Sequence, residues 1–227
     1  MTKRLVPLLR ILPPPQRRLW RELAAVPEPF VLYGGTALAL HLGHRVSEDF
    51  DFFADRNIDP ETLLRTVTFL RDAEVTQMEP NTLSCLVERG GPVRLSFFGL
   101  PRLGRVRAPH VCPGNRLKVA SLLDLAATKA AVVQRRAEAK DYIDIDALIA
   151  AGIDLPQALS AAKIVYGDRF APTPTLKALT FFEEGDLTTL PAELRRRLVE
   201  SARAVDPLRL PRISKSARAS PIPRSRR

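Results

Sequence analysis

The sequence predicts an α+β fold, with a mixed sheet in the N-terminal half followed by a helical C-terminal region. Short apolar runs that end at turn residues recur as far as residue 111, and such runs are typical of strands. Beyond Gly114, longer segments carry apolar residues at helical spacing. The composition, 45% hydrophobic and 26% charged over 227 residues, is that of a globular protein large enough to bury a sizeable core.

The strands are expected in the first half of the chain, where turn residues separate short apolar segments. Gly90-Gly91-Pro92 lies between two of these segments and predicts a hairpin. The expected strands cover residues 30–33, 49–54, 74–79, 83–89, 93–98 and 106–111.

Helix starts are marked by capping residues. Thr36 is expected to cap the first helix, and Asp59 followed by Pro60 is expected to begin the second. Ser121 and Asp124 resemble a capping box at the start of the third. The expected helices cover residues 36–43, 59–72, 121–137, 140–150, 156–165, 175–183 and 191–204.

Composition shifts divide the chain into four expected regions. The first is basic and then apolar, and its apolar part ends at Pro13-Pro14-Pro15, so we interpret it as a loose leader or a first helix that stops at the prolines. The expected regions are an N-terminal leader or helix (1–28), an α/β core (29–114), a helical region (115–206) and a basic tail (207–227).

Positive charge is concentrated at the C-terminus. The net charge is +10, and seven basic residues lie within residues 207–227, which contain no acidic residue. This segment is also rich in proline and serine, so we predict that it is disordered. It could hold a phosphate backbone electrostatically, and a solvated tail without a partner is an equal alternative. The remainder is only mildly basic, so charge alone does not establish a nucleic-acid partner.

Cysteine usage and hydropathy indicate a cytoplasmic protein without membrane association. Cys85 and Cys112 do not have the spacing of a metal site or a disulfide framework, which favours a reducing compartment. No run approaches the roughly 18 apolar residues of a membrane span.

Two carboxylates stand out in the expected strand 49–54. Asp49 and Asp51 are two residues apart, so their side chains point to the same face, and Phe50, Phe52 and Phe53 indicate that the strand is largely buried. Like charges on a buried face are costly unless a cation compensates them. Magnesium, or manganese, would do so. Two solvated acids at a strand end are the alternative, and for an isolated Asp-x-Asp they are the more common case.

The residues before this strand favour a cation site over two solvated acids. Gly34-Gly35 lies between a strand and a helix, where backbone N–H groups at a helix N-terminus attract phosphate. Thr36 and Ser47 add hydroxyl donors, and Arg45 could reach either a phosphate or the aspartate pair. Together with Asp-x-Asp on a strand, this combination is far more specific than either feature alone and predicts a site for phosphate and a divalent metal.

The segment GGTALALHLGHRVSEDFDFF, residues 34–53, resembles the first motif of the AbiEii/AbiGii toxin family, a branch of the polymerase-β-like nucleotidyltransferases. The resemblance implies that Asp49 and Asp51 hold the metal. It also implies that Gly34, Gly35 and Ser47 bind the triphosphate.

A second block, LKVASLLDLAATKAAVVQRRAEAKDYIDIDAL, residues 117–148, resembles the later motifs of this family. By this resemblance Lys129 contacts the nucleotide phosphates and Asp141 is required for activity. Lys129 lies on the apolar side of its helix. The alternative to a phosphate-binding role is a structural lysine at the edge of the core. Asp141 could equally be a structural acceptor. The remaining polar residues of the block are interpreted as a solvated face (Arg135, Arg136, Lys140), helix-surface acids (Asp144, Asp146) and a packed tyrosine (Tyr142). Contact of the three basic residues with RNA, and stacking of the tyrosine on a base, are the alternatives.

The third carboxylate of polymerase-β-like enzymes has no counterpart at the expected position. In the strand PVRLSFFGL the residue that faces the site is Ser96, because Arg94 and Phe98 share its face. Serine is neither a strong magnesium ligand nor a general base at neutral pH. Glu88 and Asp141 are candidates to replace the carboxylate.

The sequence therefore leads to a metal-dependent nucleotidyltransferase that moves an NMP from an NTP to an acceptor hydroxyl. The resemblance implies that the acceptor is the 3′ end of tRNA and that the protein is the toxin of a toxin–antitoxin or abortive-infection pair, with a cognate antitoxin. A small-molecule or protein acceptor is a second hypothesis. A degenerate NTP-binding module without transfer is a third.

Overall fold

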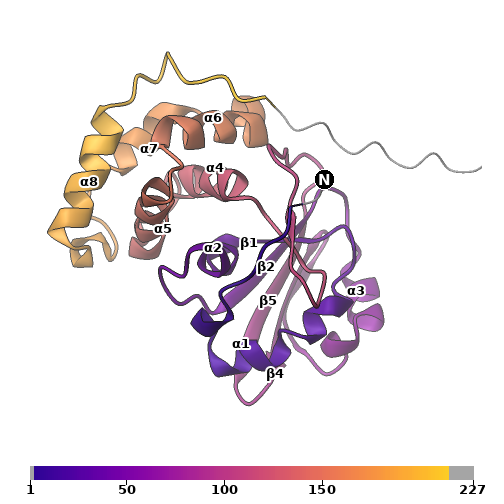
Figure 1. The fold of residues 1–227 in the computed structure, drawn as a ribbon. Helices are drawn as coiled ribbons and strands as arrows, with labels where there is room; N and C mark the ends of the chain where they lie inside the picture. Colours follow the sequence, from indigo (N-terminus) through magenta and orange to yellow (C-terminus); the bar gives the residue numbers. More distant parts are fainter. Residues whose placement is uncertain (1–2, 215–227) are drawn as a thin grey trace, which may run out of the picture.

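The computed structural model describes residues 3–214, which form a seven-stranded mixed sheet and a set of helices (Figure 1). The predicted α+β class is confirmed. The strand order is β3-β4-β5-β2-β1-β7-β6. The strands are β1 (Val31–Tyr33), β2 (Asp49–Ala54), β3 (Glu74–Glu79), β4 (Thr82–Glu88), β5 (Pro92–Gly99), β6 (His110–Val111) and β7 (Lys118–Val119).

Two parallel strands, β2 and β5, form the centre of the sheet. Strand β1 pairs antiparallel with the other edge of β2, and β4 joins β5 through the predicted hairpin. On β2 every second residue is fully buried, so the strand presents one apolar face to the core and one polar face outward. The predicted bounds of β2 and β3 are confirmed.

The helices beyond β7 gather on one side of the molecule, and the sheet lies on the other, with α2 between them (Figure 1). Helix α2 contacts β2, α4 and α5, so it links the two parts. The α-helices are α1 (Pro14–Leu19), α2 (Gly34–Leu42), α3 (Pro60–Thr66), α4 (Leu122–Val132), α5 (Ala139–Ala150), α6 (Leu155–Tyr166), α7 (Pro172–Ala178) and α8 (Ala192–Arg203). Short 3-10 segments are η1 (Leu9–Ile11), η2 (Glu22–Ala25), η3 (Thr68–Leu70), η4 (Gly167–Arg169) and η5 (Leu187–Thr189).

The N-terminal segment is not a loose leader. The short 3-10 segment η1 ends just before the prolines, and the prolines then begin α1, which fits their preference for the first helical turn. Leu12, Leu19 and Trp20 are buried in the core beneath the sheet. The predicted basic tail lies outside the described residues from position 215 onward.

The region between β5 and α4 also differs from the prediction. The expected strand 106–111 is reduced to β6, because the N–H groups of Val106 and Arg107 donate to the Asp124 carboxylate and not to a strand. Strand β7 was not predicted, and it pairs with β1 after the expected boundary at residue 114. Helix α7 starts earlier than expected.

Two apolar clusters fill the interior. One lies between the sheet and its covering helices, and the other lies among α4–α8. The division at residue 114 stays a prediction. Within residues 3–214, no single helix is long and apolar enough to cross a bilayer.

Candidate active site

The register of β2 against β5 sets the order of side chains on the polar face. Asp49 lies opposite Arg94, and Asp51 lies opposite Ser96. The carboxylate of Asp49 is 3.9 Å from the Arg94 guanidinium. Ser96 therefore occupies the position expected for a third carboxylate, and its hydroxyl is 3.1 Å from that of Ser84 on β4.

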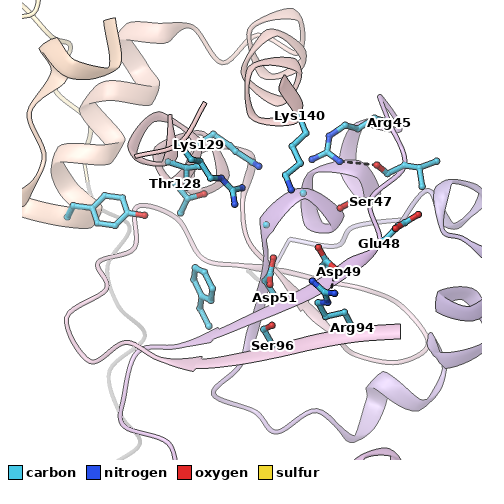
Figure 2. Close-up of a pocket in the computed structure, with 17 residues that line it drawn as sticks. Arg45, Ser47, Glu48, Asp49, Asp51, Arg94, Ser96, Thr128, Lys129 and Lys140 are labelled. Atoms are coloured by element: carbon cyan, nitrogen blue, oxygen red, sulfur yellow. Dashed lines mark hydrogen bonds and ion pairs between the residues drawn. The ribbon is translucent and has the colours of Figure 1, made fainter. Parts of the chain in front are cut away.

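A pocket of about 600 Å³ opens above this face, a size typical of small-ligand sites. Asp49, Asp51 and Ser96 lie at its floor, and Lys129 and Lys140 approach from the helices on the other side (Figure 2). Eight of the residues singled out from the sequence line it, namely Gly34, Gly35, Arg45, Ser47, Asp49, Asp51, Ser96 and Lys129. Thr36 and Asp141 are not among its lining residues.

The floor of the pocket carries negative charge that nearby cations compensate only in part. Burial and the charge of Asp49 raise the pKa of Asp51 from its ordinary value of 3.8 to about 6, although Lys129, Arg136 and Lys140 act in the opposite direction. A carboxylate in this position gains from any cation that enters the pocket.

The Gly34-Gly35 turn is packed against the functional side chains. Gly34 has φ +70°, a left-handed conformation that favours glycine, and a Cβ there would overlap the Asp51 carboxylate. A Cβ on Gly35 would lie 2.8 Å from Ser47 Oγ and would overlap the Arg45 guanidinium. The turn begins α2, so backbone N–H groups of its first turn face the same pocket.

Thr36 does not cap α2, because the helix already begins at Gly34. Its side chain is buried, and its hydroxyl donates to the carbonyl of Asp49 at 2.5 Å. Thr36 therefore fixes α2 to the start of β2 and does not line the pocket.

Lys129 projects from α4 into a buried ionic network, while its own side chain also lines the pocket. Its ammonium donates to Asp141 at 2.7 Å and lies 2.5 Å from Asp144. Both carboxylates are fully buried on α5.

The interpretation of Asp144 as a surface acid is wrong. Arg45 donates to both of its oxygens, at 2.6 and 2.8 Å, and His44 Nε2 lies 2.7 Å away. Burial alone would raise the pKa of Asp144, but hydrogen bonds from His44 and Arg45 and the charge of Lys129 hold it well below its usual range. Arg45 reaches this aspartate, and within residues 3–214 it forms no hydrogen bond or ion pair with Asp49 or Asp51.

The segment between α4 and α5, together with the start of α5, contributes more to the pocket than the solvated face that we expected. Arg136 and Lys140 line the pocket, and Arg136 donates to Asp141 at 2.8 Å. Asp141 thus accepts from Lys129 and Arg136 and positions both cations. Tyr142 packs as predicted, with its hydroxyl donating to the carbonyl of Ala178 at 3.2 Å.

The candidates to replace the third carboxylate lie elsewhere. Glu88 is at the far end of the hairpin opposite Pro92, and its carboxylate accepts from the Gly91 N–H. Asp141 is held by the cations of the network. Among residues 3–214, no three His, Cys, Asp or Glu side chains cluster as a metal site, so Asp49 and Asp51 form a pair of carboxylates without a third such side chain beside them.

A mixed sheet with paired aspartates beside a Gly-Gly helix start, facing lysine and arginine side chains, defines a nucleotidyltransferase. The chain belongs to the AbiEii family: the family model described as the nucleotidyl transferase AbiEii toxin of type IV toxin–antitoxin systems matches residues 17–218.

Several known proteins are similar to this chain in sequence or in fold. An uncharacterised protein of Aquifex aeolicus (strain VF5) is 29% identical over 158 residues, which are 68% of this chain and 74% of that protein. The fold is similar to that of MenT4, a nucleotidyltransferase toxin from Mycobacterium tuberculosis H37Rv (TM-score 0.54, 20% identity, 84% of this chain and 82% of that one). It is also similar to that of a candidate nucleotidyltransferase from H. pylori (TM-score 0.51, 20% identity, 83% and 90%).

Proposed function

We propose that this protein transfers an NMP from an NTP to an acceptor hydroxyl in a reaction that depends on a divalent metal. One observation carries the proposal. The pocket sets two carboxylates on strand β2 against cationic side chains from α4, α5 and the segment after α2 (Figure 2). A triphosphate with its metal has the complementary distribution of charge.

Asp49 and Asp51 fit a magnesium or manganese ion. Magnesium in phosphoryl-transfer sites is held by one or two carboxylates plus substrate phosphates, which is the donor set that this pocket supplies. The raised pKa of Asp51 has the same implication, since a cation would relieve the cost of its burial. When bound, such an ion polarises the transferred phosphoryl group and stabilises the charge that develops on the attacking and leaving oxygens.

The side chains above the floor would bind and orient the triphosphate. The first turn of α2 offers backbone N–H groups at Gly34 and Gly35, and Ser47 lies beside them. Lys129 and Arg45 are fixed by buried carboxylates, so their positions are set before the substrate arrives. The acceptor oxygen forms a bond to the α-phosphorus, the bond from that phosphorus to the bridging oxygen breaks, pyrophosphate leaves, and the hydroxyl proton passes to solvent.

The acceptor that we propose is the 3′ end of tRNA, and the biological role is that of a toxin with a cognate antitoxin. Family membership supports the role of a toxin with an antitoxin. The choice of tRNA as acceptor follows from the resemblance of the two sequence motifs to this family. The basic lining contributed by Arg94, Arg136 and Lys140 favours an anionic acceptor over a cationic small molecule.

Ser96 favours one other candidate, a module that binds NTP without efficient transfer. The residue beside Asp51 on β5 supplies a hydroxyl where a carboxylate would complete the metal site. Slow or absent release of pyrophosphate with tight NTP binding in calorimetry would support this candidate.

Incubation with magnesium, total tRNA and each NTP labelled at the α-phosphate tests the proposal. Asp49→Asn and Asp51→Asn should each lower labelling of tRNA by about 100-fold or more, because each removes a metal ligand. Asp55→Asn is the matched control, since Asp55 is exposed and outside the pocket. Unchanged labelling in both active-site variants would exclude the assignment.

A further inference from the structure

A second pocket of about 500 Å³ lies next to the nucleotide pocket. The two share Phe53 and Tyr166 as lining residues, so they adjoin one another. Phe53 follows Asp49 and Asp51 on the same face of β2, and it lies opposite Phe98 on β5. The second pocket therefore begins at Phe53, directly after the two aspartates on this face of β2.

Three arginines from different parts of the chain meet at this second pocket. Arg102 follows β5, Arg135 follows α4, and Arg169 ends η4. All three are exposed, and within the described part of the chain none forms an ion pair. No aspartate or glutamate lines the pocket. Three guanidinium groups without acidic partners form a site for an anion that carries several charges.

Aromatic side chains lie among these arginines. Tyr166 is the last residue of α6, Phe170 follows η4, and Phe53 is stacked on Tyr33 with ring centroids 4.8 Å apart. Burial raises the pKa of the Tyr166 hydroxyl, and the charges of Arg135 and Arg169 act against that rise, as expected when cations lie close to the ring. Arginines interleaved with aromatic rings are the combination that binds single-stranded nucleic acid, with phosphates on the cations and bases on the rings.

We propose that this arginine-aromatic pocket, formed by Arg102, Arg135, Arg169, Phe53, Tyr166 and Phe170, binds the single-stranded end of a polynucleotide acceptor. The proposal rests on the function proposed above, and adds where the acceptor lies. The phosphates nearest the end contact the arginines, a base stacks against Tyr166, and the terminal hydroxyl enters the active site past Phe53 toward Asp51. A free NTP is the less suitable occupant, because the Gly34-Gly35 turn and Lys129 already provide its phosphate contacts.

Fluorescence anisotropy with a fluorescein-labelled single-stranded RNA oligonucleotide, measured without NTP, tests the pocket separately from catalysis. The test variant combines Arg102→Ala, Arg135→Ala and Arg169→Ala. The control combines Arg65→Ala, Arg71→Ala and Arg203→Ala, which removes the same charge from exposed positions outside both pockets.

The test variant should bind the oligonucleotide more weakly, and its plot of log affinity against log salt should be flatter by about 2, at about 0.7 for each lost phosphate contact on a single strand. The control should keep the wild-type slope. Tyr166→Ala should weaken binding by about tenfold while Tyr166→Phe binds as wild type, since the ring and not the hydroxyl stacks. NTP affinity measured by calorimetry with magnesium should be unchanged in the triple arginine variant.

Equal weakening in the test and control variants would overturn the proposal, as would a loss of NTP affinity in the test variant. Binding of duplex RNA through the same arginines, or displacement of the oligonucleotide by polyglutamate of equal charge, would also overturn it. If transfer to tRNA fails while the arginine and tyrosine effects on RNA binding hold, the proposed chemistry is wrong and the binding site stands. If transfer occurs and these variants do not affect RNA binding, the site is wrong and the chemistry stands.

Discussion

Replacing Asp51 by asparagine should stabilise the metal-free protein. Burial and the charge of Asp49 raise the pKa of Asp51 from 3.8 to about 6, and the nearby cations Lys129, Arg136 and Lys140 only partly oppose the rise. A carboxyl group whose pKa is raised in the folded state ionises at a cost, so the native state loses stability as the pH rises from about 4 to about 6. The difference of about two pH units corresponds to roughly 3 kcal/mol at neutral pH.

Urea unfolding of the wild type, Asp51→Asn and the exposed control Asp55→Asn, with a chelator present, measures this effect. At about pH 7.5, Asp51→Asn should have a free energy of unfolding up to roughly 3 kcal/mol above that of the wild type, and most of the gain should disappear at about pH 4, where the unfolded carboxyl is also protonated. Magnesium should then stabilise the wild type more than Asp51→Asn, because a ligand stabilises the state that binds it. An asparagine variant that is no more stable than the wild type at pH 7.5 would refute the reasoning.

Two further substitutions test the turn and the ionic network. Gly34→Ala should abolish labelling of tRNA, because the added Cβ would displace the Asp51 carboxylate. Gly152→Ala is the control: Gly152 has φ +88°, but no atom lies near its added Cβ. This variant should lose only about 1 kcal/mol of stability and keep its activity. Asp144→Asn should lower the free energy of unfolding by about 3–5 kcal/mol, since it leaves buried cations unpaired. Asp146→Asn breaks an ion pair at the surface and should lower it by about 1 kcal/mol or less. Equal losses for the two variants in urea unfolding would contradict the burial assigned to Asp144.

Local patterns predicted most of the sheet, and pairing between distant segments accounts for what they missed. Strand β2 was predictable because its side chains alternate between the two faces over six residues. Strand β7 has two residues, too few for any period, and it exists because β1 offers a free edge to it. The prolines at the N-terminus were ambiguous, since proline can follow the end of a helix or begin one. Contacts of Leu19 and Trp20 with the core decide between these outcomes.

The site was predictable where its geometry is local. Asp49 and Asp51 share a face because of strand periodicity, and the Gly-Gly turn precedes them by a fixed stretch of chain. The role of Asp144 depends on Arg45, which is 99 residues away in sequence, and no local pattern contains that contact. One signal was present. Asp144 lies one turn from Asp141 and one turn before the apolar Leu148, so it shares the apolar side of its helix, where an acid requires a partner.

The distribution of charge around the pocket explains why a costly network can be part of an active site. Buried ion pairs contribute little net stability, because desolvation offsets their attraction. Here Asp141 and Asp144 hold three cationic side chains, Lys129, Arg45 and Arg136. Glu138 pairs with Arg136 and with Lys140, so four cationic side chains meet three carboxylates, and the one positive charge in excess faces the pocket. The floor of the pocket, formed by Asp49 and Asp51 on β2, carries negative charge. A triphosphate can therefore approach the helices while its metal approaches the floor, and neither group of side chains must reorganise to receive it. The network thus links α2, α4 and α5 into one rigid frame, and the orientation of the substrate follows from the separation of charge between that frame and the sheet.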